Sequence, residues 1–161
     1  MSFGYQKLSA PLMTLLFIVY SILMGMSFSF IFFAYSLGTI GITFAVTAGM
    51  FGVMALAGYF TKTDLTKFGS ILMMGVIGII IAMIVNFFLK SSAMGYVISV
   101  IGVLIFTGLT AYDVQKLKRI GMGIGVEQTD VRKMAIMGAL TLYLDFINLF
   151  LFLLRLFGSR D

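Results

Sequence analysis

The hydrophobic positions of this 161-residue chain form long runs that charged residues interrupt only briefly. Residues 8–61 contain no charged side chain, and further apolar runs cover 68–89, 91–112 and 134–157. A helix that crosses a bilayer needs about 20 apolar residues, so the first run is long enough for two crossings. Small and polar residues at 35–38 mark the break between them. The pattern predicts five transmembrane helices, at approximately 10–35, 37–60, 67–89, 93–117 and 133–157.

The composition points to the same class of protein. Hydrophobic residues make up 61% of the chain and charged residues 11%, whereas a soluble domain carries about 25% charged residues to cover its surface with polar groups. The solvent of this chain is therefore the lipid bilayer. We predict an all-α protein, a polytopic transmembrane helix bundle that forms a single domain over residues 1–161.

Several classes of chemistry are excluded by residues that the chain lacks. It contains no cysteine and no histidine, which rules out a disulfide framework, a Cys/His zinc site, and nucleophilic catalysis that relies on a histidine base. The net charge of +5 would suggest nucleic acid in a soluble protein. Here the basic residues lie at the ends of the predicted helices, where they orient a membrane protein. We expect no enzyme activity, no cofactor and no nucleic-acid partner.

The distribution of basic residues predicts the orientation. With five crossings, the N-terminus, the loop at 61–67 and the segment 113–133 share one side of the membrane. Eight of the 11 Lys and Arg residues lie there, and the others are Lys90, Arg155 and Arg160. Since basic residues concentrate on the cytoplasmic side, we expect a cytoplasmic N-terminus. Rows of small residues with a period of four pass through Gly25, Gly49 and Gly78, and we interpret them as places where helices approach closely.

One polar face stands out in the last predicted helix. Thr141, Asp145, Asn148, Phe152 and Arg155 follow a 4-3-4-3 spacing, which puts them on one side of a helix. An ionisable residue deep inside a crossing is costly and faces the bundle interior or a water-filled path. Asp145 is therefore either part of an ion or proton path, with Thr141 and Asn148 in support, or a hydrogen-bonding lock between helices. Arg155 either extends to the outer interface or acts as a counter-charge.

Asp113 is the second candidate. It follows Thr107 and Thr110 at three-residue steps near the end of the fourth crossing. A carboxylate at a helix end is often merely solvated. A location beside Asp145 would change its chemistry, because two adjacent carboxylates cannot easily both ionise and would share a proton. Carboxylate oxygens are also ligands that Ca²⁺ prefers. The pair Asp113 and Asp145 is therefore a candidate pH-sensitive cation site.

Four segments resemble the Bax inhibitor-1 family, also called the transmembrane Bax inhibitor motif or YccA-like family. They are Ala111–Lys118, Leu142–Phe150, Gly58–Leu65 and Ile81–Phe88. The resemblance covers essentially the whole chain, and the segments Gly58–Leu65 and Ile81–Phe88 look like those of the bacterial members. It implies a bacterial plasma-membrane protein with a seven-helix fold and a central last helix. The five predicted crossings look like the last five of that fold, so we expect the first two helices of the fold to be missing from this chain.

The resemblance also implies a function. Bacterial members are described as pH-sensitive calcium leak channels in which two aspartates sense pH, and by motif these fall on Asp113 and Asp145. Ca²⁺ and protons are the expected partners, with Ca²⁺ as a permeant or bound ion. The alternative is a regulator of stress or cell death that acts on membrane-protein partners without transport of its own. An aspartyl-type intramembrane protease is disfavoured, because neither aspartate lies in a Gly-Asp motif.

Overall fold

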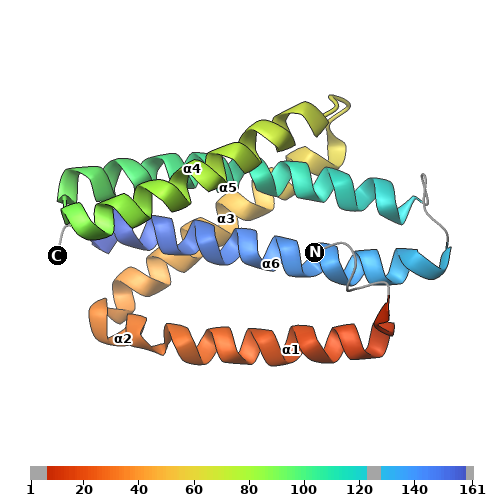
Figure 1. Cartoon of the computed structure of the whole chain (residues 1–161), viewed down its shortest axis with the longest axis horizontal. Coiled ribbons are helices and arrows are strands. Elements are labelled where there is room, and N and C mark those ends of the chain that lie inside the picture. Colours follow the sequence, from red (N-terminus) through yellow and green to blue (C-terminus); the bar gives the residue numbers. More distant parts are fainter. Residues whose placement is uncertain (1–6, 123–127, 159–161) are drawn as a thin grey trace.

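The computed structural model describes residues 7–122 and 128–158, and all regular structure within them is helical (Figure 1). Five of the helical segments are long and apolar enough to cross a membrane, which confirms the predicted all-α transmembrane class. Arg160, which was counted in the orientation argument, lies outside the described residues. The elements in chain order are α1 (Ala10–Ser27), a 3₁₀ turn (Phe28–Phe30), α2 (Ile31–Ala34), α3 (Leu37–Phe60), α4 (Thr66–Leu89), α5 (Ser92–Gly121) and α6 (Gln128–Gly158).

The helix boundaries follow local capping chemistry. α1, the 3₁₀ turn and α2 together form the first crossing, which ends where the polar residues at 35–38 predicted a break. Ser36 caps α3, because its hydroxyl accepts a hydrogen bond from the backbone N–H of Thr39 at 3.2 Å, as Ser does at many helix starts. Between α4 and α5, Lys90 adopts a left-handed conformation with φ of 50°, a common way to end a helix.

Helices α5 and α6 extend further than the apolar pattern indicated. α5 continues to Gly121 rather than ending near 117, and α6 begins at Gln128 rather than near 133. The apolar run marks only the part of a helix that lies in hydrocarbon. Lys, Arg and Gln are good helix formers, so the charged turns beyond that region remain helical.

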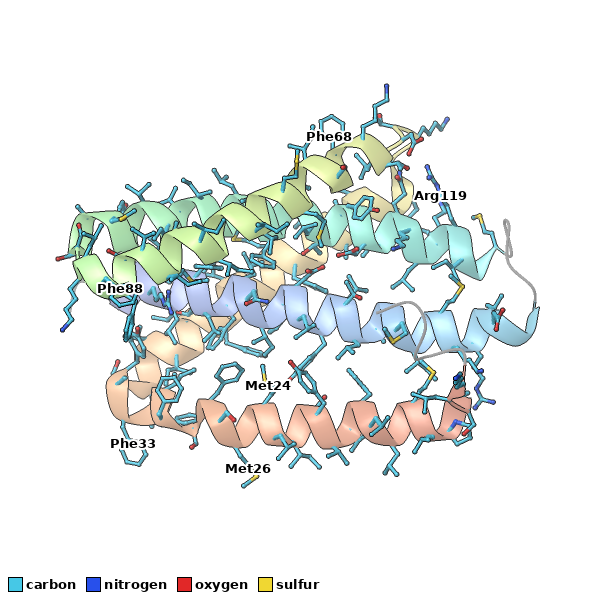
Figure 2. All side chains as sticks on the ribbon, viewed as in Figure 1. Met24, Met26, Phe33, Phe68, Phe88 and Arg119 are labelled. Carbon is cyan, nitrogen blue, oxygen red and sulfur yellow. The ribbon has the colours of Figure 1, made fainter. Side chains whose placement is uncertain are left out.

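The outer surface of the bundle is apolar, as expected for a surface that faces lipid. Phe33 is 93% exposed and Phe88 is 76% exposed, and both point outward from the bundle (Figure 2). Contiguous apolar surface of this extent is not stable in water. The helices satisfy their own backbone hydrogen bonds, as a segment in lipid must.

Helix α5 is the most enclosed of the five crossings within the described chain. It packs against α3, α4 and α6, while α1 makes its main contact with α6 (Figure 1). The resemblance implies a central last helix. In the structure, α6 packs against α1, α3 and α5 and meets α4 through the contact between Arg155 and Met83.

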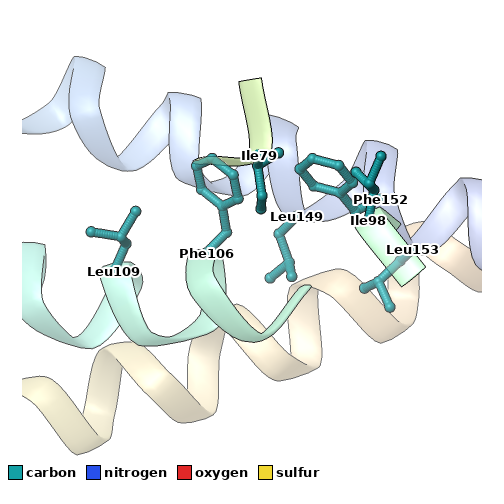
Figure 3. Close-up of a cluster of buried hydrophobic side chains, with 7 residues drawn as sticks. All are labelled: Ile79, Ile98, Phe106, Leu109, Leu149, Phe152 and Leu153. Atoms are coloured by element: carbon teal, nitrogen blue, oxygen red, sulfur yellow. The ribbon is translucent and has the colours of Figure 1, made fainter. Parts of the chain in front are cut away.

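A compact apolar cluster joins α4, α5 and α6 (Figure 3). The rings of Phe106 on α5 and Phe152 on α6 stack with their centroids 5.8 Å apart, and Leu149 has no exposed surface. We call this cluster the apolar plug, because it fills the middle of the α5–α6 interface. Its members are Ile79, Ile98, Phe106, Leu109, Leu149, Phe152 and Leu153.

The close helix contacts involve glycines other than those in the predicted rows. A side chain at Gly58 of α3 would run into the backbone of Ala111 on α5, so the absence of a Cβ lets these two helices touch. At Gly25, Gly49 and Gly78, by contrast, an added Cβ would have no neighbour within 4 Å. The interpretation of those rows as packing sites is wrong, because small residues with this period also fit a face that points toward lipid.

Candidate functional site: a buried carboxyl pair between α5 and α6

The two candidate aspartates meet across the α5–α6 interface. The carboxyl groups of Asp113 on α5 and Asp145 on α6 lie close enough together to interact directly. Asp145 is 4% exposed and Asp113 is half-buried. The Oδ2 atom of Asp145 is buried and receives no N–H or hydroxyl donor from the described residues. Two carboxyl groups at this range cannot easily both ionise, so the pair is suited to sharing one proton.

The other polar residues of the predicted site satisfy their hydrogen bonds within their own helices. The hydroxyl of Thr110, which is fully buried, donates to the carbonyl oxygen of Phe106 at 2.8 Å. Thr141 donates to the carbonyl oxygen of Met137 at 3.0 Å. Asn148 likewise donates through its amide to Leu144 on the same helix, at 2.8 Å. The structure places these groups near the pair, and their support of an ion path stays a prediction.

A cavity of about 270 Å³ leads to the pair from the end of the bundle where α5 finishes and α6 begins. A volume of this size holds several water molecules where polar groups are present to bind them. Asp113 lies on its wall, whereas Asp145 is not among the residues that line it. The lining residues are Asp113, Lys116, Leu117, Ile120, Met134, Met137, Gly138 and Thr141.

Lys116 is a site residue that the sequence reasoning missed. It lines the same cavity and lies close enough to Asp113 to attract its carboxylate electrostatically. The signal was present in the sequence, since residues three apart on a helix are neighbours and opposite charges at this spacing form pairs.

Gln115 was also missed, and it fixes the end of α5 against the loop between α3 and α4. Its side chain is 7% exposed. Its Oε1 atom accepts a hydrogen bond from the backbone N–H of Leu65 at 2.9 Å, and its Nε2 atom donates to the carbonyl oxygen of Thr63 at 2.7 Å. No local pattern predicts a contact between residues that lie 50 positions apart.

At the other end of the interface, Arg155 lies beyond the apolar plug. Its guanidinium is 5.9 Å from the ring centroid of Phe152, and its Nη1 atom is 4.0 Å from the sulfur of Met83. Arg155 and Asp145 are ten residues apart on one helix, about 15 Å at 1.5 Å per residue. Arg155 is exposed and lines a second cavity of about 320 Å³, which favours extension to the interface over service as a counter-charge to the pair. The other residues lining this cavity are Tyr35, Ser92, Gly95, Tyr96, Ser99 and Gly158.

The donor set around the pair suits a passing cation better than a resident one. Among residues 7–122 and 128–158, no group of three or more acidic, histidine or cysteine side chains could hold a metal ion. Ca²⁺ takes six to eight oxygen ligands, and two carboxylates supply at most four oxygen atoms.

Comparison with known proteins gives the family. The family model described as "Inhibitor of apoptosis-promoting Bax1" matches residues 1–161. The chain is 57% identical over 156 residues to "Inner membrane protein YbhL" of Escherichia coli K12, which covers 96% of this chain and 67% of that protein. It is 50% identical over 155 residues to an uncharacterized protein of Borreliella burgdorferi, with coverage of 96% and 67%.

An uncharacterized membrane protein of Streptococcus pyogenes serotype M6 is 40% identical over 158 residues, which cover 98% of this chain and 68% of that protein. The chain therefore spans about two thirds of the length of these bacterial relatives. The match extends over both aspartates and every helix of the bundle. The chain belongs to the Bax inhibitor-1 family of membrane proteins.

Proposed function

We propose that the chain provides a cation leak pathway of a bacterial plasma membrane, with protons controlling the leak through Asp113 and Asp145. One observation carries the proposal: two carboxyl groups lie together across the α5–α6 interface, and one of them lines a cavity large enough for water. Membrane-buried ionisable groups that face a cavity are typical of ion and proton paths. The permeant ion that fits the carboxylate chemistry is Ca²⁺.

The proton acts by setting the interaction between α5 and α6. At acidic pH one proton bridges the two carboxyl groups and holds the helices together. Loss of that proton places two negative charges side by side, and their repulsion is much larger in a low-dielectric interior than in water. The charges are relieved when the helices separate or when a cation enters between them. We therefore expect the leak to increase as the pH rises.

The apolar plug accounts for a closed state. It lies between the cavity at Asp113 and the cavity at Arg155, and the stacked rings of Phe106 and Phe152 fill the interface there. A side chain at Gly102 would collide with the Phe152 ring, at 2.8 Å from its nearest atoms. A hydrated ion cannot pass this packing, so conduction requires α6 to move relative to α5.

Calcium flux into liposomes that contain the purified chain tests the proposal. A calcium indicator inside the liposomes reports the flux while the external pH is stepped from 6 to 8. We expect a leak that rises with pH and loses its pH dependence in Asp113→Asn and in Asp145→Asn, because asparagine keeps the shape of the side chain but cannot ionise. Asp64→Asn is the matched control, since it removes one carboxylate from an exposed loop.

An unchanged pH profile in both pair variants would refute the assignment of the proton-binding groups. A loss of pH dependence in Asp64→Asn of the same size would refute it as well, because that carboxylate does not line the cavity at Asp113. Circular dichroism of each variant checks that its helices are retained. A loss of flux in a folded variant then cannot be attributed to unfolding.

An interaction protein without transport is the second candidate, and a groove between α1 and α6 favours it. The groove has a volume of about 540 Å³ and an almost entirely apolar lining, which suits a helix of a membrane-protein partner. This candidate predicts no flux at any pH and unchanged partner binding in the Asn variants. The lining residues are Leu8, Met13, Leu16, Phe17, Val19, Tyr20, Leu23, Ile136, Met137 and Leu140.

A further inference from the structure

A separate hollow at the end of the bundle is lined by basic side chains. It has a volume of about 230 Å³ and lies between the α3–α4 loop and the last turns of α5. Lys62, Lys118 and Arg119 contribute three positive charges to its wall, together with the polar side chains of Thr61 and Gln115. We call this hollow the basic pocket. It shares no lining residue with the cavity at Asp113.

Two of the three cations are held in position by local contacts. The ammonium group of Lys118 donates to the carbonyl oxygen of Tyr59 at 2.6 Å and lies 4.6 Å from the centroid of the Tyr59 ring. Arg119 forms an ion pair with Asp64 at 3.0 Å and donates to the hydroxyl of Thr66 at 3.2 Å. The hydrogen bond to Tyr59 uses one of the three N–H donors of the Lys118 ammonium group. The oxygen atoms of a ligand can accept hydrogen bonds from the other two.

The charge balance of the pocket is positive. Hydrogen bonds from the Thr66 hydroxyl, the Thr66 backbone and Arg119 lower the pKa of Asp64 to about 2, so this carboxylate is ionised at neutral pH and offsets Arg119. The charges of Lys62 and Lys118 are left to act on a ligand. Such a pocket selects an anion, and the fixed positions of Lys118 and Arg119 reduce the entropy lost on binding.

The position of the pocket in the bilayer identifies the kind of anion. Tyr59, Phe60 and Phe68 flank the α3–α4 loop and are each about half exposed or more. Tyrosine residues at helix ends, such as Tyr59, lie with their amphipathic rings at the level of the lipid headgroups. Phe68 and Arg119 lie toward the same end of the bundle (Figure 2). The pocket therefore opens beside headgroups, next to the apolar surface of α3 and α4 along which acyl chains would lie.

We propose that the basic pocket binds the phosphate of an anionic phospholipid headgroup. The phosphate oxygens accept hydrogen bonds from Lys62 and Lys118, and the acyl chains extend along the lipid-facing side of the bundle. Basic pockets at helix ends are known to recognise such headgroups. The proposal is independent of the leak function, because neither aspartate of the pair takes part.

Native mass spectrometry of the detergent-solubilised full chain tests this site. The chain is titrated with phosphatidylglycerol and, as the neutral reference, with phosphatidylcholine of the same acyl length. We expect preferential binding of phosphatidylglycerol. A basic residue near an anionic lipid contributes about fivefold to affinity, so Lys62→Gln with Lys118→Gln should weaken binding by up to about 25-fold. The double replacement by arginine should retain binding.

The matched control is Lys67→Gln with Lys116→Gln, which removes the same charge from the same end of the bundle but outside the basic pocket. Equal losses in the two double variants would overturn the proposal, because binding would then follow overall charge. Displacement of the lipid by millimolar inorganic phosphate would assign the pocket to a free anion and also overturn it. Lys62 is exposed, so the single variant Lys62→Gln serves as a substitute if the double variant of Lys62 and Lys118 fails to fold. It should lower the affinity for phosphatidylglycerol about fivefold.

Discussion

Replacing Gln115 with leucine should release the α3–α4 loop from α5. In the structure, this one buried side chain makes both of its hydrogen bonds to the loop backbone, at Leu65 and Thr63. Leucine is similar in size and is a good helix former, so α5 itself should be retained. The expected change is therefore confined to the junction between the loop and the end of α5, two residues beyond Asp113.

The size of the effect follows from the two lost hydrogen bonds. Each net hydrogen bond contributes about 0.5–1.5 kcal/mol to stability. Thr63 is exposed and Leu65 is half-buried, so water can reach the freed backbone groups in part, and the full penalty for an unsatisfied buried group does not apply. Gln115→Leu should cost about 2 kcal/mol of unfolding free energy, or roughly a 30-fold change in the folding equilibrium.

Two measurements check this prediction. Unfolding in mixed micelles with increasing sodium dodecyl sulfate, followed by circular dichroism, gives the change in free energy. Hydrogen–deuterium exchange gives the local effect, because the backbone N–H of Leu65 loses its acceptor and should exchange faster. Thr141→Val is the control: its hydroxyl bonds only to its own helix backbone among the described contacts, so we expect a change below about 0.5 kcal/mol. Unchanged Leu65 exchange in Gln115→Leu would refute the reasoning.

Two further predictions concern other parts of the bundle. The carboxyl group of Asp64 should titrate near pH 2 by nuclear magnetic resonance, with Thr66→Ala raising its pKa more than Arg119→Gln, since the Thr66 hydroxyl makes the largest contribution. Because the folded pKa lies below the ordinary value, this stabilisation is present above about pH 4 and is lost as the pH falls toward 2; a midpoint near 4 would contradict it. Gly58→Ala should destabilise the bundle in the same detergent unfolding assay, because the new methyl group meets the α5 backbone, whereas Gly49→Ala faces open space and should stabilise its helix by up to about 1 kcal/mol. Equal effects at the two glycines would contradict the packing described for α3.

The amino-acid sequence by itself determined the class of protein and its crossings. Hydrocarbon thickness fixes how many apolar residues a helix needs, and the backbone must satisfy its hydrogen bonds without water. Long apolar runs therefore translate directly into helices, and Ser36 marks a helix start by its capping chemistry. The same reasoning singled out Asp145, because a carboxylate deep in a crossing requires an interior location.

The tertiary structure decided what lies next to what. The contact between Asp113 and Asp145 depends on the register of α5 against α6, and the Gln115 contacts depend on where the α3–α4 loop folds back. Neither is encoded by spacing along one helix.

The physical reason is the solvent. In a water-soluble protein, the apolar face of a helix shows which side is buried. In lipid, both the packed side and the exposed side of a helix are apolar. The glycines at 25, 49 and 78 illustrate this, since their spacing fitted a packing face and the structure leaves them open. The lengths of the apolar runs therefore gave the number of helices, and only the packed bundle gave the orientation of each helix about its own axis.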